Sequence, residues 1–220
     1  ANPDLGADLT DLFNVLTGFA APPDYRKLIV APKHMRDRFV AMIRREADHA
    51  RAGKPARILA KMNALVDPAI IKALYEASQA GVTIDLIIRG ICCLRPGVPG
   101  VSERIRVISI IGRFLEHSRA FCFLNDGQEE VYIGSADWMP RNLERRIEAV
   151  TPVEDPLHRN TIRDLLPQMW QDNRQAWELD PAGSYTQRQP GEGEIATHRL
   201  LVESYRELGR STGEFAAVSR

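Results

Sequence analysis

The sequence has no excess of charge of either sign. Its 29 lysine and arginine residues balance 29 aspartate and glutamate residues, so the formal net charge at pH 7 is zero. A balanced charge gives no general attraction to nucleic acid or to an anionic lipid surface. We therefore expect no nucleic-acid partner. Any anion-binding site must be local, formed by a few cationic side chains that converge.

Cysteine is scarce, and long apolar runs are missing. The three cysteines, Cys92, Cys93 and Cys122, form an odd number and lack the spacing of metal ligands. Reduced thiols in a cytosolic protein are the simplest interpretation. No apolar run approaches the roughly 20 residues that a membrane-spanning helix needs, and no secretory signal is visible. We expect a cytoplasmic protein, and peripheral association with the inner membrane stays open.

The short motifs of several nucleotide-binding and hydrolytic enzymes are also missing. The sequence has no P-loop lysine motif, no GxGxxG and no GxSxG. Four of the five histidines stand in expected helices or loops without coordinating partners, so we expect no metal ligands in this chain. These four are His34, His49, His158 and His198.

What the first part of the chain does have is an alternation of strands and helices. After a short helix over 8–16, apolar patterns predict strands at 27–32, 56–63 and 83–90, and helices at 33–53 and 69–81. Asp67 and Pro68 provide the N-cap and first residue of the second of these helices. The alternation indicates an α/β layer structure with parallel neighbouring strands.

From residue 104 the pattern becomes rich in β-strands. Four runs, at 104–111, 119–125, 129–136 and 146–153, have strand character, and "NDGQ" between the middle two is a hairpin signal. Antiparallel pairs are therefore expected beside the parallel ones. The predicted fold class is α/β, with a mixed sheet flanked by helices.

The rest of the chain is predicted to be helical, with one interruption. A helix should start at Asp155 or Pro156 and run to Trp177, with a kink or break at Pro167. We divide the chain into a domain over 1–180, a polar linker over 181–194, and a C-terminal helix and tail over 195–220. The tail should fray from Ser211.

Polar residues follow the apolar strands directly. Asn63 follows "ILAKM", Arg89 follows "IDLII", Ser135 follows "EEVYI", and His117 precedes the strand at 119. In open α/β sheets, ligands bind beyond the carboxyl ends of the strands. Lys61 lies within a strand, where its charge can reach the same rim.

Three arginines can join this group. Arg89, Arg119 and Arg146 would hold phosphate oxygens through guanidinium contacts. His117 could donate or accept a proton at a phosphoryl oxygen. Two simpler roles stay open: His117 as an ordinary surface residue, and Arg119 as the partner of an ion pair with Glu116 or Glu129, which are nearby in the sequence. From the residues alone, we predict a phosphate site near His117.

Several of these motifs together resemble a known family. The segments "LVDPAIIKALYEASQAGVTIDLIIRGICCLRPG", "RVISIIGRFLEHSRAF" and "VYIGSADWMPRNLERRIEAVTPV" resemble the carboxy-terminal part of polyphosphate kinase, which makes inorganic polyphosphate from ATP. The resemblance implies a fold similar to one half of phospholipase D. "HSR" and "GSAD" are then degenerate forms of the His-x-Lys and Gly-Ser-x-Asn signatures. Arg119 replaces the lysine, Asp137 the asparagine, and Leu124 an expected aspartate.

The resemblance also implies roles for single residues. Arg89 would contact an ATP phosphate, His117 would assist transfer near the γ-phosphate, and Arg146 would line the phosphate tunnel. Weaker extensions of the same argument cover Arg119, Lys61, Asn63 and Ser135.

Parts of the family's machinery are not found in this sequence. The resemblance implies a phosphorylated histidine and magnesium-binding residues in a preceding domain, and the first residue is not methionine. We therefore expect a part of a larger enzyme, inactive alone, with Mg²⁺ bound outside this chain. ATP or ADP and inorganic polyphosphate would be its substrates. The preceding domains and further copies of the enzyme would be its partners. The alternatives are a phospholipase D-like phosphodiesterase and a non-catalytic polyanion-binding or oligomerisation module.

Overall fold

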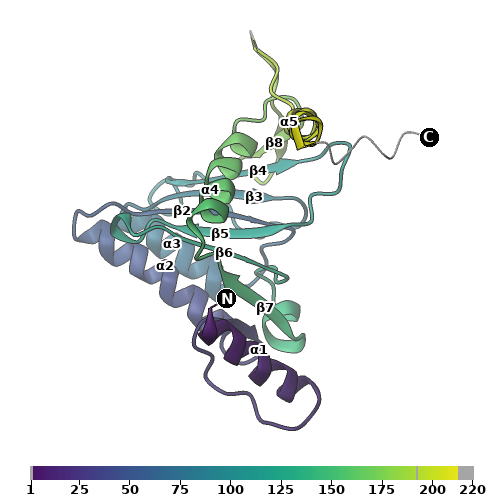
Figure 1. Ribbon diagram of the computed structural model, residues 1–220. Helices are drawn as coiled ribbons and strands as arrows, with labels where there is room; N and C mark the ends of the chain where they lie inside the picture. Colours follow the sequence, from purple (N-terminus) through teal and green to yellow (C-terminus); the bar gives the residue numbers. More distant parts are fainter. Residues whose placement is uncertain (1, 192, 213–220) are drawn as a thin grey trace.

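A nine-stranded sheet forms the centre of the molecule (Figure 1). The computed structural model describes residues 2–191 and 193–212. The strands are β1 (Ile29–Ala31), β2 (Arg57–Met62), β3 (Thr83–Ile88), β4 (Ile105–Ile110), β5 (Arg119–Phe123), β6 (Glu130–Gly134), β7 (Glu148–Pro152), β8 (Ala176–Leu179) and β9 (Tyr185–Gln187). Their order in the sheet is β1-β7-β6-β5-β2-β3-β4-β8-β9. The pairs β2–β3 and β3–β4 are parallel and the other pairs are antiparallel, which confirms the predicted mixed sheet.

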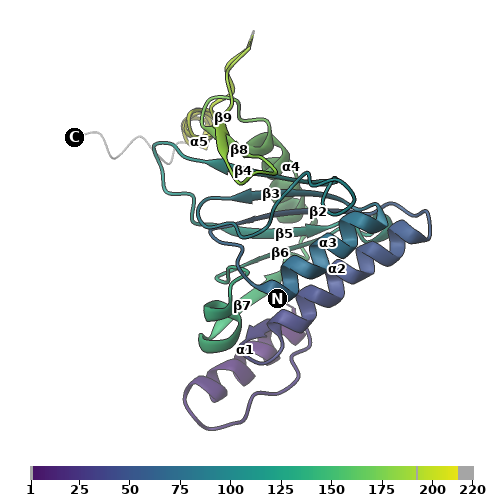
Figure 2. The same ribbon diagram turned by 180° about the vertical axis from the view of Figure 1, so that it is seen from behind.

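Helices cover both faces of the sheet. Figures 1 and 2 show α2 (Met35–Arg51) and α3 (Pro68–Ala80) on one face and α4 (Pro156–Trp170) on the other. The remaining long helices, α1 (Pro3–Leu16) and α5 (Thr197–Thr212), lie at opposite ends of the row of strands. Two short helical turns, η1 (Asn125–Gly127) and η2 (Arg141–Arg145), join strands. The predicted fold class, an α/β mixed sheet flanked by helices, is therefore confirmed.

Each face of the sheet has its own apolar core. The larger core lies under α2 and α3 and contains the fully buried rings of Phe39, Phe121 and Trp138. Phe121 stacks on Trp138 with ring centroids 5.2 Å apart. A smaller core under α4 includes Leu166 and Met169. Burial on both faces explains why the central strands are almost continuously apolar.

The predicted helix caps are present. Asp67 accepts hydrogen bonds from the N–H groups of Ala69 and Ile70, both at 3.1 Å, and starts α3. Gly81 ends that helix with φ at 108°, a left-handed value that glycine adopts without strain. Asp155 caps α4, and Pro156 is its first residue. The first helix starts at Pro3 rather than at residue 8, because Asn2 caps it.

Two predictions for the helix expected from Asp155 or Pro156 to Trp177 are wrong. The helix expected to reach Trp177 ends at Trp170, and Trp177 belongs to β8, which pairs with β4. Pro167 lies inside α4 without breaking it. Within the expected linker 181–194, residues Tyr185–Gln187 form the edge strand β9. The division of the chain at residue 180 stays a prediction. Helix α5 includes Ser211, and the rest of the expected tail, 213–220, lies outside the described residues.

Asp172 explains why the chain leaves the helix where it does. Its side chain is fully buried, and Oδ1 accepts hydrogen bonds from the N–H groups of Arg174, Gln175 and Ala176 at 2.6–3.1 Å. Its other oxygen accepts from the N–H of Thr197 at 2.7 Å and so anchors the start of α5. Burial raises the pKa of Asp172, but these backbone hydrogen bonds outweigh it, and the pKa is lowered.

We expect Asp172→Asn to lower the free energy of unfolding by about 1–3 kcal/mol at pH 7, because an amide NH₂ would face the N–H of Thr197. The lowered pKa means that the carboxylate stabilises the fold above its unfolded pKa of about 3.9, and that this contribution is lost as the pH falls through the lower folded value. Urea unfolding at pH 7 and pH 3.5 should therefore show a smaller difference between variant and wild type in acid. Asp164→Asn, at an exposed position of α4, is the control.

The cysteines and helices agree with two further expectations. Cys92, Cys93 and Cys122 are free thiols. Burial raises the pKa of Cys92 to about 11 and that of Cys122 to about 12, so both stay protonated and unreactive at neutral pH. Among the described helices, none has the length and apolar character to cross a bilayer.

Candidate active site

The sheet topology brings every predicted site residue to one edge of the sheet, the edge formed by the ends of its central strands. Strands β2 and β3 run parallel and end there, β5 runs antiparallel and starts there, and β6 and β7 continue this alternation. The residues at or next to this edge are Lys61, Asn63, Arg89, His117, Arg119, Ser135 and Arg146. The strand-end argument from sequence therefore selects neighbouring positions.

A buried ion pair lies in the middle of the edge. Arg119 binds both carboxylate oxygens of Asp137, from Nε at 3.2 Å and from a terminal nitrogen at 3.0 Å. Only 10% of the Arg119 side chain and 8% of the Asp137 side chain are exposed. The backbone N–H of Asn63 donates to Asp137 at 2.7 Å, and Arg119 also donates to the carbonyl of His117 at 2.6 Å. Arg119 is therefore paired with Asp137, and the proposed alternatives Glu116 and Glu129 are not its partners.

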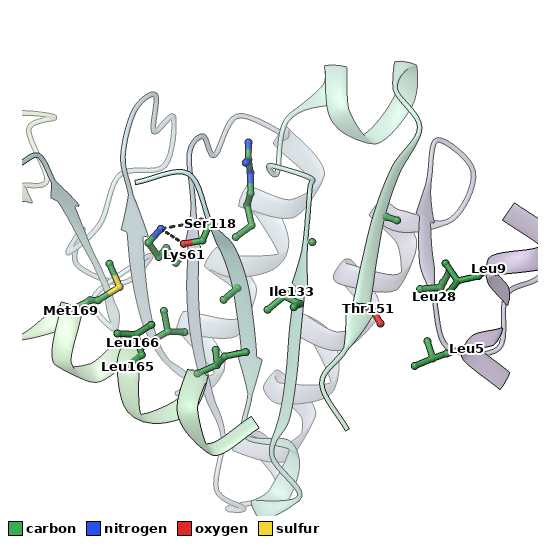
Figure 3. A pocket seen from close by; sticks show the side chains of 15 residues that line it. Leu5, Leu9, Leu28, Lys61, Ser118, Ile133, Thr151, Leu165, Leu166 and Met169 are labelled. Atoms are coloured by element: carbon green, nitrogen blue, oxygen red, sulfur yellow. Dashed lines mark hydrogen bonds between the residues drawn. The ribbon is translucent and has the colours of Figure 1, made fainter. Parts of the chain in front are cut away.

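Lys61 is buried beside this pair and binds the loop that carries His117. Its ammonium donates to the carbonyl of Ser118 at 3.0 Å and to the Ser118 hydroxyl at 2.8 Å (Figure 3). It also pairs with the Glu116 carboxylate at 2.9 Å. Burial lowers the pKa of Lys61, and the contact with Glu116 opposes this shift. All three ammonium protons have acceptors within the protein.

Two further groups bind the backbone of the same loop. Arg89 is half-buried and donates to the carbonyl of Glu116 at 3.2 Å. The side-chain amide of Asn63, in the orientation that satisfies both of its ends, donates to the same carbonyl at 2.8 Å and accepts from Arg119. His117 thus lies between two residues, Glu116 and Ser118, that are each held by several bonds. Its own imidazole is exposed.

Ser135 and Arg146 lie at the same edge but make their contacts elsewhere. The Ser135 hydroxyl accepts from the N–H of Ala149 in β7 at 3.2 Å. Arg146 is exposed, and its guanidinium nitrogen Nη1 lies 3.9 Å from the carboxylate oxygen Oε1 of Glu148. The structure therefore joins Lys61, Asn63, Arg89, Arg119 and the His117 loop, but does not bond Ser135 or Arg146 to them.

Three residues of the network were missed as site residues. Asp137 had a sequence signal, because it replaces the asparagine of a Gly-Ser-x-Asn pattern. Glu116 precedes His117 and was considered only as a partner of Arg119. His198 of α5 lies 2.5 Å from Glu116, and nothing in the local sequence indicates that pairing.

An apolar hollow begins at the polar edge. It has a volume of about 650 Å³ and runs between α4 and the strands towards α1. Figure 3 shows Leu165, Leu166 and Met169 on one side and Leu5 and Leu9 on the other, with the cationic end at Lys61. The site residues thus border a surface of mainly apolar character.

The edge does not fit a magnesium ion. In the part of the chain that the structure describes, no three His, Cys, Asp or Glu side chains are grouped as metal ligands. The two carboxylates of the edge already bind cations: Asp137 binds Arg119, and Glu116 binds Lys61. Mg²⁺ prefers carboxylate and water oxygens that are open to it, so no step is assigned to a metal held here.

Comparisons with known proteins agree with this arrangement. The family "Polyphosphate kinase C-terminal domain 2" matches residues 28–198. Polyphosphate kinase of Thermosynechococcus vestitus is 67% identical over 90% of this chain, and that of Synechocystis sp. is 65% identical over 96%. The crystal structure of polyphosphate kinase from Porphyromonas gingivalis superimposes with a TM-score of 0.90 at 40% identity, over 96% of this chain.

The match covers only a part of each relative. The chain spans 28% and 29% of the two cyanobacterial proteins and 33% of the crystallised one. Residues 57–153, which contain the whole strand edge described above, lie inside the matched range 28–198. The chain therefore belongs to the polyphosphate kinase family, as its C-terminal domain 2.

Proposed function

We propose that this chain is one part of an enzyme that reversibly transfers the γ-phosphate of ATP to inorganic polyphosphate. Family membership and the name shared by its relatives support this activity. The chain spans less than a third of the first relatives, so the relatives contain further segments. In this proposal a preceding domain supplies the phosphohistidine. In this proposal the chain forms one wall of the tunnel for ATP and polyphosphate, and alone it does not turn over ATP.

The observation that carries the proposal is the presentation of His117. Its imidazole is exposed, while the residues on both sides are fixed by buried groups. A fixed and exposed imidazole can donate a proton to, or hydrogen-bond with, a phosphoryl oxygen in transfer. Positioning and charge stabilisation are what phosphoryl transfer mainly requires from protein.

The cations divide into two roles in this proposal. Arg89 and Arg146 keep guanidinium groups that are half-buried or exposed, which suits contacts to phosphate oxygens. Lys61, Arg119 and Asn63 have their hydrogen bonds taken up inside the protein, which favours support of the loop over direct contact with substrate. Ser135 would contribute through its position next to Arg119, whose strand pairs with Gly134.

The contacts of Arg119 argue against a phospholipase D-like hydrolase. That chemistry would need a lysine in the third place of the His-x-Lys signature. Here the residue is an arginine whose guanidinium is occupied by Asp137. A non-catalytic polyanion-binding or oligomerisation module stays the second candidate, and loss of His117 separates it from the enzyme.

The wider setting of the enzyme is also proposed. Mg²⁺ would accompany ATP with ligands outside this chain, in agreement with the occupied carboxylates of the edge. The enzyme would act as a homo-oligomer in the cytoplasm, with peripheral contact to the inner membrane as a further possibility. The balanced charge supports the absence of a nucleic-acid partner.

Substitution of Arg89 tests the assignment of the phosphate wall. In the intact enzyme, Arg89→Gln keeps a donor for the Glu116 carbonyl but removes the charge. Loss of one charged hydrogen bond to phosphate should raise KM for ATP roughly ten-fold or more. Arg104→Gln is the matched control, because Arg104 is exposed at the opposite edge of the sheet, just before β4. Equal KM values for both variants and wild type would remove Arg89 from the site.

A further inference from the structure

Helix α5 brings a buried histidine into contact with the His117 loop. His198 lies in the first turn of α5, and only 4% of its side chain is exposed. Its Nε2 lies 2.5 Å from the Glu116 carboxylate, and its Nδ1 lies 3.2 Å from the backbone nitrogen of Phe114. Both ring nitrogens therefore bind the loop that carries His117, one at Phe114 and the other at Glu116.

These partners determine which nitrogen of His198 carries the proton. A backbone N–H can only donate, so Nδ1 accepts from Phe114 and has no hydrogen of its own. Nε2 then carries the hydrogen and donates to the carboxylate of Glu116. A hydrogen bond with a charged acceptor is about twice as strong as one between neutral groups.

The bond from His198 continues into the centre of the site. The second carboxylate oxygen of Glu116 pairs with Lys61 at 2.9 Å, and Lys61 donates to the carbonyl and hydroxyl of Ser118. The chain of contacts therefore runs from α5 through Glu116 and Lys61 to Ser118. His117 lies between Glu116 and Ser118, the two loop residues in this chain of contacts.

The part of the loop before Glu116 has fewer contacts than residues 116–118, and one of them is the bond from the N–H of Ile111 to the carbonyl of Gln175 at 3.1 Å. Residues 111–118 form neither helix nor strand. The apolar side chains of Phe114 and Leu115 are 48% and 72% exposed, so burial does not fix them. Gly112 packs so closely against the ring of His198 and the side chain of Gln175 that a methyl group there would overlap both. The loop is thus shaped around His198.

We propose that His198 is a positioning residue that, through Glu116, fixes the loop presenting His117 to the phosphoryl group. The inference rests on the proposed function for its effect on catalysis. Its structural part, the ordering of the loop by His198, stands or fails independently of any activity.

Contacts besides those of His198 hold the start of α5, which makes substitution of His198 informative. Thr197 binds the buried carboxylate of Asp172, and Ala196 beside it is buried as well. We therefore expect α5 to stay in place when the imidazole is replaced. His198→Phe removes both hydrogen bonds and keeps an aromatic ring. His198→Gln restores a donor near the position of Nε2, and His198→Asn restores an acceptor near that of Nδ1.

The test uses the intact enzyme and two measurements. In polyphosphate synthesis from Mg-ATP, His198→Phe should lower kcat on the order of ten- to a hundred-fold, because small misplacement of a reacting group has effects of this size. KM for ATP should stay within about two-fold, since Arg89 and Arg146, the residues proposed to contact phosphate, are not substituted. His198→Gln should recover most of kcat, and His198→Asn less. His158→Phe, on the exposed side of α4, is the control.

Amide hydrogen exchange of the peptide covering 111–118 is the second measurement. Exchange should be roughly ten-fold faster or more in His198→Phe than in wild type and in His158→Phe, because the free energy needed to open the loop locally becomes smaller. Unchanged exchange would overturn the inference, and so would a loss of kcat that His198→Gln does not recover. A wild-type enzyme that makes no polyphosphate would instead reject the proposed function, while faster exchange in His198→Phe would still support the ordering role.

Discussion

Replacement of His117 by alanine is expected to lower the rate of polyphosphate synthesis by the intact enzyme about a hundred- to ten-thousand-fold, the usual contribution of a positioned acid or base. The imidazole is exposed, and in the described part of the chain the hydrogen bond of this residue is the one that its backbone carbonyl accepts from Arg119. Stability should therefore change by no more than about 0.5 kcal/mol. Synthesis is measured as polyphosphate formed from Mg-ATP, and folding as the urea midpoint.

His117→Gln distinguishes the two chemical roles open to this residue. Glutamine can hydrogen-bond to a phosphate oxygen but cannot transfer a proton at neutral pH. If His117 acts as a proton donor, His117→Gln should be as slow as His117→Ala. If it stabilises charge by hydrogen bonding, His117→Gln should regain part of the rate.

The matched control is His158→Ala, which removes another exposed imidazole, from α4. It should leave the rate unchanged. A wild-type rate in His117→Ala would contradict the catalytic role and favour the non-catalytic binding module.

The features of the fold that could be predicted from sequence depend on local chemistry. Asp67 and Pro68 start α3 because a side-chain cap and a proline act within a few residues of the helix end. The central strands were recognisable because both of their faces are covered, which makes them apolar throughout. The order of parallel strands then placed Asn63 and Arg89 at one edge.

The features that could not be predicted depend on contacts between distant segments. Trp177 was assigned to a helix, but buried Asp172 binds three successive backbone N–H groups and turns the chain into β8. The edge strand β9 has only three residues and no alternation of apolar and polar side chains, so it was indistinguishable from a polar linker. His198 meets Glu116 only because α5 docks at the far end of the same sheet.

The site itself shows the same limit. Arg119 was expected to bind phosphate, and its sequence neighbours offered Glu116 and Glu129 as simple partners. The actual partner, Asp137, lies in the "GSAD" turn and becomes a neighbour through the pairing of β5 with β6. A departure from a signature, asparagine to aspartate, marked a structural ion pair. Sequence reasoning selected residues that lie close together in the structure, but it could not distinguish supporting groups from exposed ones.

Removal of the Asp137 carboxylate is expected to be the most destabilising change at the site. Asp137→Ala would leave the buried guanidinium of Arg119 without its partner and the N–H of Asn63 without an acceptor. Breaking a buried pair in this way lowers the free energy of unfolding by about 3–5 kcal/mol. Urea unfolding of the chain, followed by circular dichroism, measures the change.

A double-mutant cycle tests whether the ion pair itself causes this loss. Arg119→Met removes the charge but keeps a long apolar side chain, so Arg119→Met with Asp137→Ala should be less destabilised than the sum of the two single changes, by about 1–3 kcal/mol. The exposed pair Arg163–Asp164, with 45% and 60% of the side chains exposed, is the control. Asp164→Ala should cost less than about 1 kcal/mol. If Asp137→Ala costs no more than this, or the two changes at the site are additive, Arg119 and Asp137 do not hold the edge together, and Arg119 becomes available for phosphate.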